Sequence, residues 1–259
     1  EIGVKVKTKK VSAGTTYNYK MPEFISFESE QLNDLKELVV KANFVVNDKG
    51  SVLIPDELKK VINFDGAKYK IGIGGLHSQE KKQAVVCGEN QKLFEKDVTS
   101  YYPNIILGQN LYPKHLGPKF LTMYKDIVER RIKAKKSGDK DMANSLKLVI
   151  NSSFGLFGNK YSFLYSPDLL IQTTITGQLC LLMLIEKVVK TGAKVVSVNT
   201  DGINIICSNS TYEEVNFICD EWEFDTGYNL EETPYQATYN ESVNSYIAVM
   251  PDGKVKSKG

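Results

Sequence analysis

The segment Lys92–Ile106 has the sequence KLFEKDVTSYYPNII, and this stretch decides the fold. Apolar and charged residues alternate over Lys92–Val98 as they do in a half-buried strand, and this strand ends in the carboxylate of Asp97. The residues that follow fit a strand-to-helix junction. We therefore expect Asp97 at the edge of a sheet, where it can carry chemistry. The competing interpretation is a helix-capping aspartate, with Tyr102 a core aromatic residue.

Two strong helical patterns lie downstream, at Pro118–Lys136 and Lys140–Ser152, separated by Ser137-Gly138-Asp139. They predict an antiparallel helical hairpin. The hairpin is basic, because nine Lys and Arg residues face four Asp and Glu residues between positions 119 and 147. Such a surface could bind phosphates, although a solvated helix face is the alternative.

The second helix of the hairpin ends in the sequence KLVINSSFG, in which Lys147, Asn151 and Phe154 lie at i, i+4 and i+7. These residues share one helix face, which can meet a triphosphate at one end and a base pair at the other. On the first helix, Arg131 and Lys135 are also four residues apart. Lysine and arginine supply the charge-assisted donors that a polyphosphate requires.

The sequence SVNTDG at 197–202 lies between two β-branched runs, Val195–Val198 and Ile203–Cys207. An Asp-Gly pair in this context predicts the turn of a β-hairpin. A tight hairpin would also bring Asp201 to the surface of the sheet. The alternative is an ordinary turn.

These three strings resemble motifs A, B and C of family B DNA polymerases, in the family's order and about fifty residues apart each time. Motif B of the family is K-x-x-x-N-S-x-Y-G, so Phe154 replaces a tyrosine and removes a hydroxyl from beside the base pair. Motif C is Y-x-D-T-D-S, so Asn199 replaces its first aspartate and only Asp201 can carry the metal charge. The resemblance covers roughly residues 71–259.

Two weaker similarities flank these motifs. The sequence IGGLHS at 73–78 is similar to the Y-x-G-G motif with which some phage polymerases touch the template, but it lacks the tyrosine. A plain glycine turn with a structural histidine, His77, is the alternative. The sequence KVKSKG at 254–259 is similar to the K-x-K-G element that follows the primer-template backbone, and a charged flexible terminus is the alternative.

The resemblance implies specific roles. The metal ligands would be Asp97, the backbone carbonyl of Val98, and Asp201, which would bind two Mg²⁺ ions that Mn²⁺ can replace. The catalytic residues would be Asp97, Asp201 and Lys147. The nucleotide would be bound by Ser100, Tyr101, Tyr102, Arg131, Lys135, Lys147 and Asn151, with Tyr102 excluding a 2′-hydroxyl. DNA would be bound by Gly74, Gly75, Phe154, Gly155, Lys256 and Lys258.

The implied fold class is α+β: a polymerase palm, with helices packed on an antiparallel sheet, and an inserted helical-hairpin fingers subdomain. Residues 1–90 would lead into the palm, 91–117 and 159–259 would form it, and 118–158 would form the fingers. Other patterns predict further elements. Helices are expected at Leu32–Ala42, Asp168–Lys190 and Thr211–Phe224, and strands at Tyr69–Ile73, Tyr161–Tyr165, Leu230–Tyr239 and Ser245–Met250.

The composition is that of a folded chain: 259 residues, 42% hydrophobic, 25% charged and a net charge of +2. The four cysteines form no C-x-x-C pair, which favours reduced thiols in a cytoplasm, that of the host cell if the protein is viral. The most apolar stretch, Leu169–Val189, is interrupted by polar residues and predicts a buried helix rather than a membrane span.

The expected function is template-directed DNA synthesis from dNTPs on a primer-template, with no membrane involved. Too few residues precede Asp97 for the family's proofreading exonuclease, and the chain stops where a thumb would begin, so we expect a fragment of a larger, viral enzyme. One rival is a catalytically weak or inactive fragment that only binds nucleotide or DNA. Another is a reverse transcriptase or RNA-dependent polymerase, which the motif B helix disfavours.

Overall fold

The computed structural model describes residues 8–259, and it confirms the α+β class. Residues 1–7 of the predicted lead-in lie outside the described part. The helices are α1 (Glu30–Lys41), α2 (Tyr101–Gly108), α3 (Lys119–Lys136), α4 (Lys140–Leu156), α5 (Pro167–Lys190) and α6 (Tyr212–Thr226). The strands are β1 (Thr16–Tyr17), β2 (Phe44–Val46), β3 (Val52–Leu53), β4 (Ile62–Phe64), β5 (Ala67–Lys70), β6 (His77–Ser78), β7 (Gln83–Val86), β8 (Gln91–Val98), β9 (Lys194–Asn199), β10 (Gly202–Ser208), β11 (Leu230–Tyr235), β12 (Ala237–Ser242), β13 (Ser245–Val249) and β14 (Val255–Lys258).

The chain forms two compact units. The first comprises residues up to 20, 41–55 and 102–173, and the second comprises 21–40, 56–101 and 174–259. The first unit holds the three-stranded sheet β1-β2-β3 and the helices α3 and α4. The second holds the two larger sheets, α6 and most of α5.

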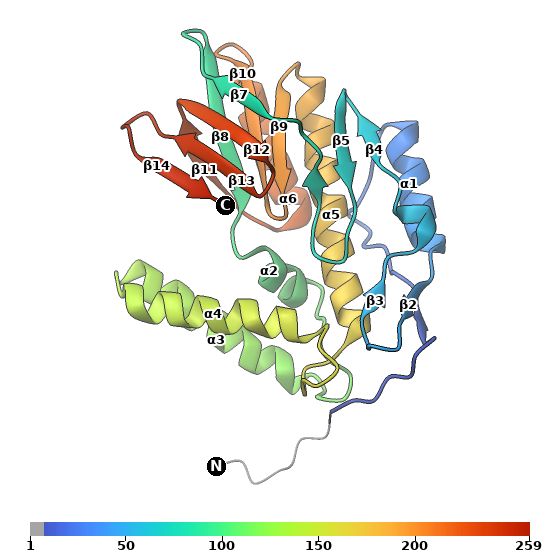
Figure 1. Ribbon diagram of the computed structural model, residues 1–259. Helices are drawn as coiled ribbons and strands as arrows, with labels where there is room; N and C mark the ends of the chain where they lie inside the picture. Colours follow the sequence, from blue (N-terminus) through green and yellow to red (C-terminus); the bar gives the residue numbers. More distant parts are fainter. Residues whose placement is uncertain (1–7) are drawn as a thin grey trace. The chain divides into compact units, whose positions relative to one another are not determined.

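The first unit contains the predicted helical hairpin, with α3 and α4 side by side (Figure 1). Gly138, at φ +77°, makes the turn, and the carboxylate of Asp139 accepts a hydrogen bond from the Met142 amide at 3.0 Å, which caps α4. The strand predicted at Tyr161–Tyr165 is wrong, because this segment consists of turns. Its aromatic residues are used otherwise: the Tyr165 hydroxyl donates to the Gly50 carbonyl at 2.7 Å.

The second unit is built on a seven-stranded antiparallel sheet with the order β11-β8-β10-β9-β6-β5-β4. The strand β8 therefore lies between β10 and β11. A four-stranded sheet, β14-β13-β12-β7, packs on one face of it through a core that includes Leu93, Tyr235 and Ala248. The single strand predicted at Leu230–Tyr239 is wrong, because the chain changes sheets at Gln236: β11 pairs with β8, and β12 pairs with β7 and β13.

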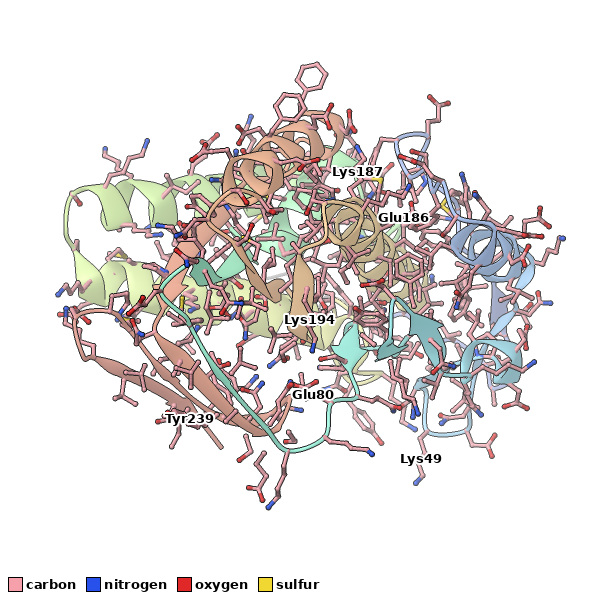
Figure 2. All side chains as sticks on the ribbon, turned by 90° about the horizontal axis from the view of Figure 1, so that it is seen from above. Lys49, Glu80, Glu186, Lys187, Lys194 and Tyr239 are labelled. Atoms are coloured by element: carbon pink, nitrogen blue, oxygen red, sulfur yellow. The ribbon has the colours of Figure 1, made fainter. Side chains whose placement is uncertain are left out.

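The helix α5 confirms the predicted buried helix. Among the described residues it is the one helix long and apolar enough to cross a membrane, and 89% of its most apolar window is buried within the protein. Its one buried carboxylate, Glu186, is labelled in Figure 2 and accepts hydrogen bonds from the amides of Glu28 and Ser29, at 2.9 and 2.7 Å. A buried charge is tolerated when backbone donors satisfy it in this way.

Candidate active site

Asp97 and Asp201 lie at neighbouring strand ends in the second unit. Asp97 is the penultimate residue of β8, and Gly202, the first residue of β10, is its partner in the antiparallel ladder. The amide of Val98 donates to the carbonyl of Asp201 at 2.7 Å. Two carboxylates far apart in the sequence are thereby brought to one edge of the sheet, as the motifs A and C predict.

The two carboxylates affect each other's charge. Burial, followed by the negative charges of Asp201 and Glu95, raises the pKa of Asp97 from 3.8 to about 7. Glu231, the partner of Asp97 on β11, acts in the same direction, and Lys256 opposes it. Half of the Asp97 population would therefore hold a proton near neutral pH unless a cation compensates the charge.

A first prediction concerns this pKa. Asp201→Asn is expected to lower the pKa of Asp97 from about 7, while burial keeps it above its ordinary value. A carboxyl whose pKa is raised in the folded state binds more protons than in the unfolded chain, so its contribution to stability is lost as the pH rises from about 4 to about 7. Asp201→Asn should weaken this loss. Carbon-13 NMR titration of the metal-free chain and unfolding at several pH values measure both effects, and an unchanged Asp97 titration would contradict the prediction. Asp225→Asn, an exposed partner of Lys187, is the control.

Three further residues of this region were not predicted as a group. Glu95 lies two residues before Asp97 and so on the same face of β8. Its carboxylate forms an ion pair with Lys256 of β14 at 2.7 Å and accepts a hydrogen bond from the Tyr235 hydroxyl at 2.6 Å. The period of two along β8 was the available signal for Glu95. The pairing with Lys256 had none, because it depends on how the two sheets pack. Lys258, the second lysine expected to bind DNA, pairs with Tyr246 in the ladder between β13 and β14.

The predicted glycines and the residues after Asp97 have defined places. Gly75 lies against Thr200 at the tip of the β9–β10 hairpin, and Gly74 is exposed beside it. Ser100 adopts a positive φ of 49° where β8 leads into α2. The Tyr101 side chain is buried, and its hydroxyl donates to the carbonyl of Gly177 at 2.6 Å.

In the first unit the structure brings together two residues predicted separately from motifs A and B. The ring of Tyr102, on α2, stacks on that of Phe154, on α4, with centroids 4.2 Å apart and planes at 21°. Phe157 meets Phe154 edge-on at 6.2 Å. The aromatic face that would lie beneath a nucleotide is therefore a packed pair of rings.

The remaining hairpin residues lie at the helix surface. Lys147 and Asn151 are exposed on α4, as is Gly155, where an added methyl group would meet nothing within 4 Å. On α3, Lys135 is exposed and Arg131 is half-buried. Lys147, Asn151 and Phe154 follow one helix face, so the cation and the stacked rings occupy the two ends of this face.

The second unit fits a metal of the predicted kind only in part through protein ligands. Within residues 8–259, no group of three or more His, Cys, Asp or Glu side chains is arranged to hold a metal ion. A site of two carboxylates suits Mg²⁺, because this ion keeps several waters and takes other oxygens from phosphate. The raised pKa of Asp97 fits such an ion too, because the carboxylates lack a nearby compensating charge of their own strength.

Comparisons with known proteins support the fold. No protein-family model and no curated protein matches the chain. A solved structure does: that of the family B DNA polymerase from the hyperthermophilic archaeon Pyrobaculum calidifontis, with a TM-score of 0.52 and 18% sequence identity. The match covers 70% of this chain and 28% of the polymerase. The chain therefore has the fold of a part of a family B DNA polymerase.

Proposed function

We propose that this chain catalyses template-directed DNA synthesis, transferring a nucleotide from a dNTP to a primer 3′-hydroxyl, as the palm and fingers portion of a larger, viral polymerase. The observation that carries the proposal is the pair Asp97 and Asp201 at adjoining ends of β8 and β10. The order of the three motifs and the fold of the archaeal polymerase support it.

Each residue has a role in this proposal. The carboxylates of Asp97 and Asp201, with the carbonyl of Val98, would hold two Mg²⁺ ions. Bound there, the ions would lower the pKa of the primer hydroxyl and stabilise charge on the leaving pyrophosphate. Lys147 and Arg131 would neutralise charge on the triphosphate, and Lys147 is placed to donate a proton to the leaving group.

Primer extension with Mg²⁺ or Mn²⁺ tests the proposal. The chain should add the nucleotide that the template dictates, and the addition should disappear in Asp201→Asn. A wild-type chain that adds no nucleotide, or that adds nucleotides without regard to the template, would contradict it.

The alternative, a fragment that binds nucleotide or DNA without turnover, is favoured by one observation. Asn199 occupies the position of the family's first motif C aspartate, and its amide nitrogen donates to the Val243 carbonyl at 2.9 Å. This side chain is thus engaged in structure rather than in metal binding. Titration of labelled primer-template and dNTP, combined with the extension assay, separates binding from synthesis.

A second prediction concerns sugar selection. Tyr102→Val is expected to raise the use of ribonucleotides relative to deoxynucleotides, because it removes the ring that would contact the 2′ position. Phe154→Leu should raise the ratio less, because it removes only the stacking partner, 4.2 Å away, that holds this ring. Competitive incorporation assays measure the ratio. Tyr161→Ala is the control, since its side chain is exposed outside the stack. A ratio that stays constant in Tyr102→Val would disprove the assignment.

A further inference from the structure

The segment from Gly74 to Glu80, which the sequence relates only to template contact, lies along the tip of the β9–β10 hairpin. This tip, Asn199-Thr200-Asp201, carries the second carboxylate. The amide of Thr200 donates to the carbonyl of Leu76 at 2.9 Å, and His77 pairs with Asn199 in the ladder between β6 and β9. The His77 Nε2 atom lies 3.3 Å from the hydroxyl of Thr200. The tip is therefore held by both backbone and side-chain contacts.

Gly75 makes the closest of these contacts. A Cβ atom at this position would lie 2.9 Å from the Cγ2 atom of Thr200 and 3.1 Å from its Cα atom. Carbon atoms in contact normally stand about 3.5 to 4.0 Å apart. The Cα atom belongs to the backbone of the tip, so rotation of the Thr200 side chain cannot relieve the clash. Thr200 already has a φ of +62°, a conformation that a β-branched residue rarely adopts.

A second set of contacts holds the strand that leads into the tip. The Ser78 hydroxyl accepts a hydrogen bond from the Val198 amide at 2.8 Å and donates to Glu80. The carboxylate of Glu80, in the connection between β6 and β7 (Figure 2), also accepts from the Ser197 hydroxyl at 2.7 Å and from Asn240 at 3.3 Å. Three donors on different strands thus converge on one carboxylate.

We propose that the Gly74–Glu80 segment is a clamp that positions Asp201, with Gly75 and Glu80 as its positioning residues. Thr200 is the residue next to Asp201, and all the contacts described converge on Thr200 or on the strand before it. The inference extends the proposed function, since it assigns to this segment the alignment of a catalytic carboxylate. It differs from a template contact, which would act on DNA affinity and not on the geometry of Asp201.

The experiment compares Gly75→Ala with the double variant Gly75→Ala/Thr200→Gly. The added methyl group should displace the tip and lower kcat for primer extension by up to about a hundredfold, the effect of misplacing a catalytic group by about 1 Å. The dissociation constant for primer-template should change little. Glycine at position 200 removes two of the three clashing atoms and tolerates positive φ, so the double variant should recover at least part of kcat. Gly108→Ala, where the methyl group meets nothing within 4 Å, is the control.

Hydrogen exchange provides a readout that does not depend on synthesis. Amides in residues 196–203 should exchange faster in Gly75→Ala and in Glu80→Ala than in the wild type, with unchanged exchange in α3 and α4. Glu80→Ala also serves if Gly75→Ala does not fold. A wild-type chain without extension activity would refute the proposed function and leave the exchange experiment valid. Unchanged exchange at the tip, or a loss confined to DNA affinity that Thr200→Gly does not relieve, would overturn the clamp.

Discussion

Asp97→Asn is expected to lower kcat for primer extension by more than about a thousandfold, at least as much as the loss of one transition-state donor from an active site. Asparagine preserves the shape of the side chain but removes the negative charge that would bind both ions. Asp97 lies within the sheet, between β10 and β11, so no neighbouring loop can move another carboxylate into its place. Single-turnover extension at saturating dNTP measures the loss.

The same substitution should weaken metal binding, because a neutral amide is a poor ligand for a hard divalent cation. Titration with Mn²⁺, followed by electron paramagnetic resonance, measures this without DNA. Asp225→Asn changes an aspartate of the same unit that forms an ion pair with Lys187 on the helices, and it should retain wild-type kcat and Mn²⁺ affinity. An Asp97→Asn chain with more than about a tenth of wild-type activity would exclude a metal-bound role for this carboxylate.

The sequence was most informative where one local pattern determines the structure. Helical periodicity predicted α3, α4 and α5, and the Asp-Gly turn between β-branched runs predicted the β9–β10 hairpin. Both errors came from patterns that several structures share. Aromatic residues at Tyr161–Tyr165 have a high strand propensity but pack here in turns. The change of sheets at Gln236 has no local signal, because the alternation continues from β11 into β12 while the pairing partner changes.

The candidate site followed the same division. The carboxylates Asp97 and Asp201 were predicted because each ends a recognisable element. Their pairing in register, and the proximity of Glu231 and Lys256, depend on the order of strands that are far apart in sequence. The contact of Gly75 with the hairpin tip is of the same kind: the sequence indicates a glycine turn, and only the packing reveals what the missing side chain leaves room for.

Lys147→Ala and Arg131→Ala are expected to weaken the use of dNTPs by roughly ten- to hundredfold each, because a hydrogen bond to a charged group contributes about 1.5 to 3 kcal/mol. Several negative charges on a triphosphate need converging cations. Residues 195–253 contain no lysine or arginine, so the hairpin is the better source of these charges.

The geometry of the first unit supports this choice of residues. Lys147 precedes Phe154 by seven residues on one face of α4, which is about 10 Å along a helix axis. A nucleotide whose base approaches Phe154 would therefore extend its phosphates toward Lys147. Arg131 and Lys135 lie on α3, the helix that packs along α4, so both helices can contribute cations to the same phosphates.

Lys133→Ala is the matched control, because Lys133 is an exposed lysine of α3 two residues from Arg131, on a different part of the helix surface. Pre-steady-state kinetics give the dNTP dissociation constant and the rate of incorporation for all three variants. Loss of affinity in Lys147→Ala and Arg131→Ala, together with a further loss of rate in Lys147→Ala, would identify Lys147 as the residue that also acts on the leaving group. Equal, small effects in all three variants would leave only a solvated basic hairpin, because general electrostatic attraction does not distinguish lysines on different faces of one helix.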